Sequence, residues 1–286
     1  MENINNNIIF GTAQFDKNYG LEKNNNSLSQ KINFLNKIEQ HNCYGIDTAL
    51  AYKDAQKTIG DWIRFTNKKP RIYTKISNLN IDTNLDNLLA RCLNELSIEA
   101  LEGLFIHNQK EWKNNATREF ASKTLEKGLI KSFGMSIYDS SFIPIHQNVQ
   151  LLQVPGNIFN QEVLNSDQLN VFYENGGQIQ VRSIFLQGLL LMDYKNLSSF
   201  FEEIRKPLKL FHNIAKESNN HPISIASQCI LKLYPKCKLV IGANSTEQLK
   251  ELLEKININI DEYVIDEVLK LGKKYPHKLW DPRYWQ

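Results

Sequence analysis

The sequence lacks the features of disulfide-rich, zinc-binding and nucleic-acid-binding proteins. Its four cysteines, Cys43, Cys92, Cys229 and Cys237, lie far apart, with no C-x-x-C pair and no Cys/His cluster. This spacing argues against a disulfide framework or a metal site and suits a reducing compartment. No run of Lys or Arg exceeds two residues and the formal net charge is only +3, so the composition gives no support for nucleic acid as a partner.

Long apolar runs are also missing. Residues 1–7 are polar and Asn-rich, and the apolar run that follows, 8–10, is far too short for a signal peptide or a membrane helix. We therefore expect a cytoplasmic protein with no membrane partner. The chain has 286 residues, 42% hydrophobic and 23% charged, which argues against disorder and allows a large buried core.

Strand-like apolar runs alternate with amphipathic helical runs along the whole chain. The spacing predicts strands over 8–13, 43–47, 71–76, 100–107, 130–137, 149–154, 178–182 and 238–242. It predicts helices over 28–40, 55–65, 82–96, 117–127, 163–173, 198–217, 224–233, 246–255 and 261–272. Asp54 and Ser245 are the expected N-caps of two of these helices, and Gly128 is expected to end another.

Eight strands alternating with helices, without a linker, predict a single (β/α)₈ TIM barrel over residues 1–286. The active site of such a barrel lies at the C-terminal rim of the strands. A doubly wound open sheet is the alternative. The Gly-x-Gly-x-x-Gly turn of one kind of dinucleotide-binding open sheet is absent, which disfavours this alternative without excluding it.

Ionisable side chains stand at the ends of the second, third and fourth expected strands. Asp47 ends the second strand, Tyr52 follows on its loop, Lys75 lies in the third strand and His107 closes the fourth. Singly, such residues are typical of a helix cap, a snorkelling lysine or a structural histidine. In a barrel, however, these strand ends converge on one rim, so the four side chains can meet.

Together the four groups form a set that can protonate a carbonyl oxygen. An ammonium lowers the pKa of a neighbouring phenol and makes it a better proton donor. A carboxylate pairs with the buried lysine, because an unpaired buried charge is costly. A neutral imidazole can orient a polar group of the substrate. A hydride must then come from another source.

The sequence resembles the aldo-keto reductases in motifs that follow one another along nearly the whole chain. The shared segments are Asp47-Thr48-Ala49-x-x-Tyr52, Thr74-Lys75, 105–107, 128–136, 152–157, 181–188 and Gly242-Ala243-Asn244-Ser245-x-x-Gln248-Leu249-x-Glu251. The resemblance implies NAD(P)H-dependent reduction of an aldehyde or ketone. Tyr52 would be the general acid, Lys75 and Asp47 would tune its pKa, and His107 would orient the substrate carbonyl.

The resemblance also implies where the cofactor binds. Ser136 and Gln153 would hold the nicotinamide carboxamide, Arg182 would stack on its ring, and the backbone of Phe185, Leu186, Gln187 and Gly188 would line the pyrophosphate. The adenosine end would lie on Gly242, Asn244, Ser245, Gln248 and Glu251. Taken singly, these polar loop residues are equally typical of caps and turns.

The cofactor expected from the resemblance is NADPH, with NADH possible. Gly242 and Gln248 stand where many family members have the Lys and Arg that bind the 2′-phosphate, so no guanidinium is available there for bidentate pairing. No metal is expected. A barrel that binds the cofactor as a regulatory subunit or sensor, and a non-redox enzyme acting on a sugar phosphate, are the alternative functions.

The segment 275–286 is an aromatic C-terminal tail. In the family this segment often walls the substrate pocket, which would make Trp280 a substrate-binding residue. Packing of the tail onto the barrel is the equally weighted alternative. As a wall, the donors of Trp280, Arg283 and Tyr284 would suit a sugar-like carbonyl substrate.

Overall fold

The strands of the protein form a closed, all-parallel barrel. The computed structural model describes residues 4–15, 27–77, 84–113, 115–144 and 149–285. The strands follow chain order around the barrel: β1 (Ile8–Gly11), β2 (Gly45–Asp47), β3 (Ile72–Ile76), β4 (Gly103–Ile106), β5 (Phe133–Ser136), β6 (Leu151–Pro155), β7 (Gln178–Arg182) and β8 (Lys238–Ile241). Because β8 pairs with β1, the barrel is confirmed and the open sheet is wrong.

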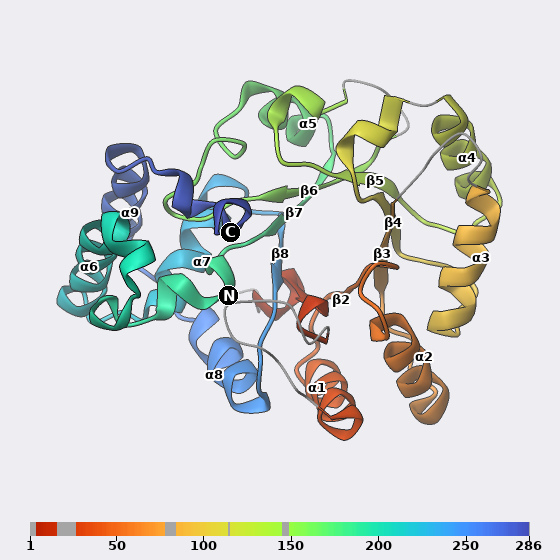
Figure 1. The fold of residues 1–286 in the computed structure, drawn as a ribbon, viewed down its shortest axis with the longest axis horizontal. Coiled ribbons are helices and arrows are strands. Elements are labelled where there is room, and N and C mark those ends of the chain that lie inside the picture. The colour runs from red at the N-terminus through yellow and green to blue at the C-terminus, as the bar shows by residue number, and fades with distance from the viewer. Residues whose placement is uncertain (1–3, 16–26, 78–83, 114, 145–148, 286) are drawn as a thin grey trace.

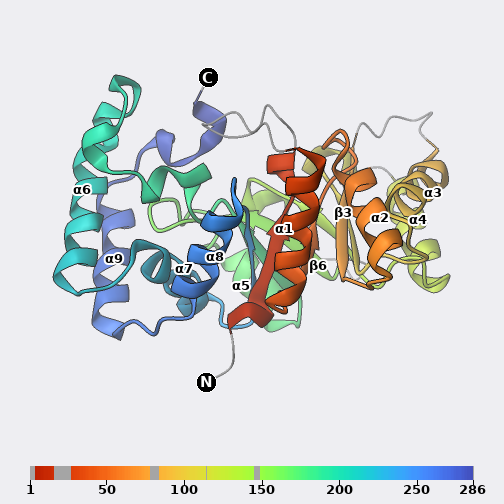
Figure 2. The same ribbon diagram turned by 90° about the horizontal axis from the view of Figure 1, so that it is seen from below.

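Helices surround the ring of strands, as Figure 1 shows. They are α1 (Leu28–Gln40), α2 (Ala55–Thr66), α3 (Leu85–Leu96), α4 (Asn115–Glu126), α5 (Asp167–Glu174), α6 (Glu202–Glu217), α7 (Pro222–Leu233), α8 (Thr246–Ile256) and α9 (Glu262–Lys274). Two short 3₁₀ turns, η8 (Lys278–Trp280) and η9 (Pro282–Tyr284), form the tail. Figure 2 shows the first described element, η1 (Ile4–Asn7, red), and the tail (dark blue) at opposite ends of the barrel.

Most helix boundaries follow the expected cap chemistry. Ser245 accepts a hydrogen bond from the Gln248 N–H, and Gly128 follows α4 with a φ of 67°. Asp54 does precede α2, but its side chain makes no cap hydrogen bond because its backbone is not extended. The expected helix at 163–173 begins only at Asp167, since the Ser166 side chain caps the Leu169 N–H.

Several strands are shorter than the apolar runs that predicted them. The fifth expected strand, 130–137, is paired as a strand only from Phe133 to Ser136, and Ile130 forms an isolated bridge with Leu101. The first strand ends at Gly11, because the chain turns into a 3₁₀ helix from Ala13. The start of the helix expected at 82–96 lies outside the described residues.

Alternation along the strands decides which side chains enter the barrel. Ile9, Tyr73, Phe105 and Leu151 form a small buried cluster of their own, while their sequence neighbours join the larger core beneath the helices. Side chains two positions apart share a face of a strand. The residues two positions after these four therefore continue the interior towards the C-terminal rim, and they include Lys75, His107 and Gln153.

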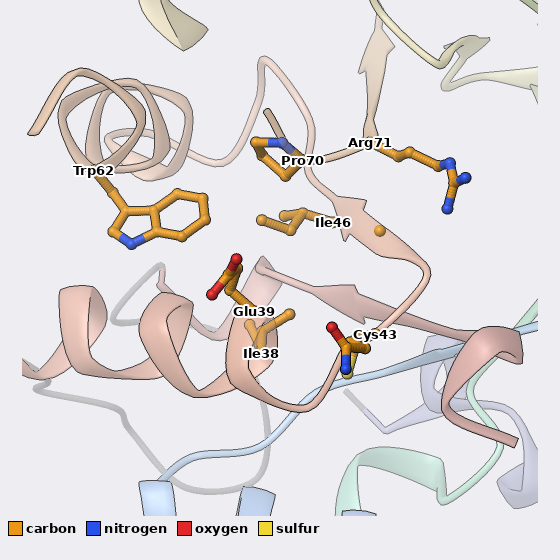
Figure 3. A pocket seen from close by; sticks show the side chains of 9 residues that line it. Ile38, Glu39, Cys43, Ile46, Trp62, Pro70 and Arg71 are labelled. Carbon is orange, nitrogen blue, oxygen red and sulfur yellow. The ribbon is translucent and has the colours of Figure 1, made fainter. Parts of the chain in front are cut away.

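Near the N-terminal end of the barrel, a small hollow lies between α1, α2 and the strands. Its volume is about 140 Å³ and it lies beside the starts of β2 and β3, with Trp62, Ile46 and Pro70 around it (Figure 3). Within the part of the chain that the structure describes, no helix is long and apolar enough to cross a bilayer. Those same residues include no cluster of His, Cys, Asp or Glu that could hold a metal ion.

We predict that Gly60→Ala destabilises the fold by about 1–3 kcal/mol, the usual cost of overpacking. A Cβ at Gly60 would lie 2.0 Å from the Glu95 carbonyl oxygen, so α2 and α3 would have to separate. Gly11→Ala is the matched control, because its Cβ would make ordinary contacts of 3.4 Å or more. Urea denaturation of both variants measures the effect, and equal stabilities would contradict the prediction.

Candidate active site

An ion pair between Lys75 and Asp47 lies inside the barrel, near the C-terminal ends of β3 and β2. The Lys75 ammonium donates to both carboxylate oxygens of Asp47, at 2.6 Å each, and to the Thr48 carbonyl oxygen at 3.0 Å. The two residues are only 1% and 3% exposed. Burial, with a contribution from Arg182, lowers the pKa of Lys75, and the Asp47 carboxylate opposes that shift. The carboxylate therefore keeps the buried ammonium charged.

Tyr52 lies on the loop between β2 and α2, beside this ion pair. The loop is held to β3, because the Leu50 N–H donates to the carbonyl oxygen of Lys75 itself at 3.0 Å. The Lys75 ammonium lies 5.5 Å from the centre of the Tyr52 ring. The His107 ring meets the Tyr52 ring edge-on, with centroids 6.1 Å apart. The structure thus brings together the four side chains that the strand ends predicted.

His107 follows β4 and opens onto a pocket. Burial, then the positive charges of Lys75 and Arg182, lower the pKa of His107 to about 4. The imidazole is therefore neutral at pH 7 and keeps one N–H donor. The pocket has a volume of about 560 Å³ and is lined by Ala51, Ser77, His107, Asn108, Gln109, Lys110 and Tyr138. A small organic molecule can reach His107 through it.

Two buried amides, Gln153 on β6 and Gln180 on β7, extend the ion pair across the barrel. The Gln153 Nε2 donates to Asp47 Oδ1 at 2.8 Å and to Gln180 Oε1 at 3.1 Å. Both acceptors require the NH₂ group of Gln153, so its Oε1 points elsewhere and has no partner among the described residues, and the same holds for Gln180 Nε2. Sequence analysis missed Gln180, although its inward position on β7, two residues before Arg182, is a signal that identifies it.

The other residues assigned to the nicotinamide end also lie near this rim. Ser136 ends β5 beside Gln153 in the register of β5 and β6, and both are buried. Arg182 ends β7 and donates to the Ile137 carbonyl oxygen at 3.2 Å. Its guanidinium lies over the Tyr138 ring, 4.1 Å from the ring centre.

The loop after β7 has an unusual backbone. Ser183, Leu186, Gln187 and Gly188 all have positive φ angles, from 49° to 94°. For residues other than glycine this conformation is uncommon and costs energy, and such residues cluster at functional sites. The loop includes Phe185 to Gly188, the stretch expected along the pyrophosphate.

The residues expected at the adenosine end lie at the start of α8. The side-chain Oε1 of Gln248 accepts from the Asn244 N–H at 2.8 Å, and the Ser245 hydroxyl accepts from the Gln248 N–H, so these side chains already serve the helix start. Gly242 packs against the Gln14 amide, with which a Cβ at this position would collide. Glu251 is exposed and lies 3.6 Å from His221. That these residues bind the cofactor therefore stays a prediction.

The aromatic tail packs on the barrel through Trp280. This side chain is 1% exposed and stacks on Phe159, with ring centres 4.0 Å apart. Its indole N–H donates to the Tyr275 carbonyl oxygen at 2.9 Å, and that of Trp285 donates to Leu279 at 2.8 Å. The indole donors are thus used within the tail, which favours packing as the role of Trp280. A substrate-binding role for it stays a prediction.

We predict that Lys75→Met costs about 3–5 kcal/mol of unfolding free energy, because it leaves the Asp47 carboxylate buried without its ammonium. The double variant Asp47→Asn, Lys75→Met removes both charges and is expected to recover on the order of 1–3 kcal/mol of that loss. Chemical denaturation of the wild type, the two single variants and the double variant gives the interaction free energy between Asp47 and Lys75. Strictly additive effects would show that the pair does not behave as a buried ion pair.

The free energy of unfolding is predicted to depend on pH through His107. The unfolded chain binds this proton near pH 6.5 and the folded protein only near pH 4, so the unfolded state holds more protons between these values. The contribution of neutral His107 to stability is therefore present above pH 6.5 and is lost as the pH falls towards 4. We expect the wild type to lose more stability than His107→Asn between pH 7 and pH 4.5. An NMR titration of the His107 ring with a midpoint above pH 6 would contradict this.

Comparison with known proteins agrees with this geometry. A search of curated protein sequences finds no significant match. Similar solved structures include a glycerol dehydrogenase from Gluconobacter oxydans (TM-score 0.76, 16% identity, covering 94% of this chain and 92% of that one). An aldo-keto reductase from Bacillus halodurans (TM-score 0.74, 15% identity, 95% and 94% covered) is also similar. So is an aldo/keto reductase from Klebsiella pneumoniae solved with NADP and acetate (TM-score 0.68, 17% identity, 95% and 92% covered).

These similar structures establish the fold. Membership of a family is established by a match to the sequence profile of that family. The profile of the Aldo/keto reductase family matches residues 7–273. This range contains all eight strands and the Asp47, Tyr52, Lys75 and His107 cluster. The chain belongs to the aldo/keto reductase family of NAD(P)H-dependent oxidoreductases.

Proposed function

We propose that the protein reduces an aldehyde or ketone to an alcohol with Tyr52 as the proton donor. The observation that carries the proposal is the buried Lys75–Asp47 ion pair beside Tyr52, whose ring meets that of His107, a residue that lines a pocket. Four free thiols suit a reducing compartment, from which we infer a cytoplasmic enzyme.

Each member of the cluster has a separate task. A bound NAD(P)H supplies the hydride that reaches the carbonyl carbon. Tyr52 gives its phenolic proton to the oxygen, and the Lys75 ammonium stabilises the phenolate that remains. Asp47 keeps Lys75 charged at a site where burial disfavours charge. Neutral His107 donates a hydrogen bond to the carbonyl oxygen and so orients the substrate.

The residues around the rim fit a nicotinamide cofactor. Gln153 Oε1 and Gln180 Nε2 are buried polar atoms without partners among the described residues. The carboxamide of a nicotinamide has both a donor and an acceptor group with which to satisfy such atoms. Ser136 stands beside Gln153, and the guanidinium of Arg182 is a planar group that can stack on a ring.

NADPH is the cofactor we propose, and we expect the protein to bind it only slightly more tightly than NADH. The Klebsiella pneumoniae relatives were solved with NADP and with NADPH. In this chain no Lys or Arg occupies position 242 or 248, and the side-chain Oε1 of Gln248 already accepts a hydrogen bond from the Asn244 N–H. A 2′-phosphate therefore lacks bidentate pairing with a guanidinium at these two positions.

We predict that Tyr52→Phe abolishes carbonyl reduction, with a loss in kcat of about 10²-fold or more, because the general acid is gone. The affinity for NADPH, measured by fluorescence titration, should change little, since the phenol acts only on the substrate. Tyr263→Phe is the matched control, because Tyr263 is an exposed tyrosine of α9. Wild-type turnover by Tyr52→Phe would refute the assignment. Unaltered NADPH binding without any carbonyl reduction by the wild type would favour a sensor.

A further inference from the structure

Three polar side chains lie next to one another inside the barrel, on β5, β6 and β7. Ser136 is the register partner of Gln153, and Gln153 is the register partner of Gln180. Each of the three residues is at most 2% exposed. The resemblance implies that Ser136 and Gln153 hold the nicotinamide carboxamide, and it assigns nothing to Gln180. A glutamine in such a place requires a physical reason, because a buried amide is costly unless its groups are hydrogen-bonded.

The side chain of Gln180 binds the amide group of Gln153. Gln180 Oε1 accepts from Gln153 Nε2 at 3.1 Å, and the same nitrogen donates to Asp47 Oδ1 at 2.8 Å. A primary amide has two N–H donors and one carbonyl oxygen. Both donors of Gln153 are therefore used, one for each acceptor, and its amide group is held at two points.

These two hydrogen bonds leave a single orientation for the Gln153 amide. Asp47 is paired with Lys75, and an ionised carboxylate only accepts hydrogen bonds. Turning the amide over would therefore place its oxygen against the oxygens of both Asp47 and Gln180. With Asp47 alone, the amide would still swing about one hydrogen bond, and Gln180 removes this freedom. The Gln153 Oε1 is thus turned away from both acceptors, and no described residue donates to it.

Packing alone does not explain a glutamine at position 180. Its Nε2 is buried and finds no acceptor in the part of the chain that the structure describes. An unmet buried donor costs free energy, whereas an apolar side chain of the same shape has no such donor. An apolar side chain, however, cannot accept the second N–H of Gln153. Local costs of this kind are expected at functional sites.

We propose that Gln180 is a positioning residue for the nicotinamide end of the cofactor. It holds Gln153 so that Oε1 stays free to accept from the carboxamide NH₂ group, while Nε2 keeps its hydrogen bond to Asp47. The inference rests on the proposed function, because it requires a bound nicotinamide cofactor. Gln180 thus acts through Gln153, whose side chain is ordered before the cofactor arrives and loses less freedom on binding.

Two replacements of Gln180 separate positioning from packing. Gln180→Met keeps the shape of the side chain and removes the acceptor. Gln180→Glu keeps a carboxyl oxygen for Gln153, but it places a second acid near Asp47. NADPH affinity, measured by fluorescence titration, should fall about three-fold to ten-fold for Gln180→Met, the worth of one hydrogen bond. For Gln180→Glu it should fall by no more than about two-fold, because the acceptor remains.

The stabilities of the cofactor-free variants should follow the opposite order. Gln180→Met removes the unmet donor together with the acceptor, so its Tm should lie within about 3 °C of the wild-type value. Gln180→Glu brings an acid into a site that is 1% exposed, and burial disfavours its charged form, so its Tm should be lower. A variant that is less stable and yet binds NADPH more tightly indicates positioning, because a packing role would favour methionine in both measurements.

A double variant tests whether Gln180 acts through Gln153. Gln153→Met should weaken NADPH binding by about ten-fold. Adding Gln180→Met should cause no further loss, because the group that Gln180 positions is already absent. Gln178→Met is the matched control, since it also replaces a glutamine of β7 by methionine, but Gln178 is exposed. This control should bind NADPH as the wild type does.

The outcomes separate this inference from the proposed function. The positioning role is wrong, and the carbonyl reductase stands, if Gln180→Met binds NADPH like the wild type or if Gln180→Glu loses at least as much affinity. Additive losses in the double variant would also contradict it, as would a Gln180→Met protein that fails to fold, because that would show a structural role. If the wild type binds neither NADPH nor NADH and reduces no carbonyl compound, the proposed function fails and this inference fails with it.

Discussion

The site depends on one interaction, the ion pair between Lys75 and Asp47 inside the barrel. An ammonium in a place that is 1% exposed is stable only if a carboxylate faces it. The carboxylate in turn takes a hydrogen bond from Gln153, which also donates to Gln180. A charge-neutral, hydrogen-bonded unit therefore joins β2, β3, β6 and β7. Its rigidity gives Tyr52 and His107 a fixed electrostatic environment in which to act.

The barrel and the four clustered residues could be predicted from the sequence because both follow from local patterns. Alternation of apolar runs identifies strands and helices, and parallel strands in a barrel place their C-terminal ends on one rim. Asp47, Lys75 and His107 stand at such ends, so their meeting follows from topology alone. Boundaries were less accurate: Val163 and Leu164 are apolar enough to extend a helix, yet the side chain of Ser166 starts α5 later.

Contacts that depend on strand register, or on the route of the chain outside the strands, could not be predicted. Gln180 meets Gln153 across neighbouring strands, and only the observed register of β6 and β7 shows that the two amides are paired. The approach of Arg283 to Tyr138 requires the route of the tail, which no periodicity encodes. Trp280 illustrates the same limit. As an aromatic residue in a tail it could wall a pocket or pack on a barrel, and only the stacking with Phe159 distinguishes the two.

The attachment of the tail has an evolutionary consequence. Tyr52, Lys75, Asp47 and His107 all belong to the barrel, whereas Arg283 is carried by a segment that contacts the barrel through the stacking of Trp280 on Phe159. The residues of the proposed reaction and the C-terminal tail thus lie on separate segments of the polypeptide. A substitution in the tail can therefore accumulate without altering the contacts among Asp47, Tyr52, Lys75 and His107, because none of these contacts involves a tail residue.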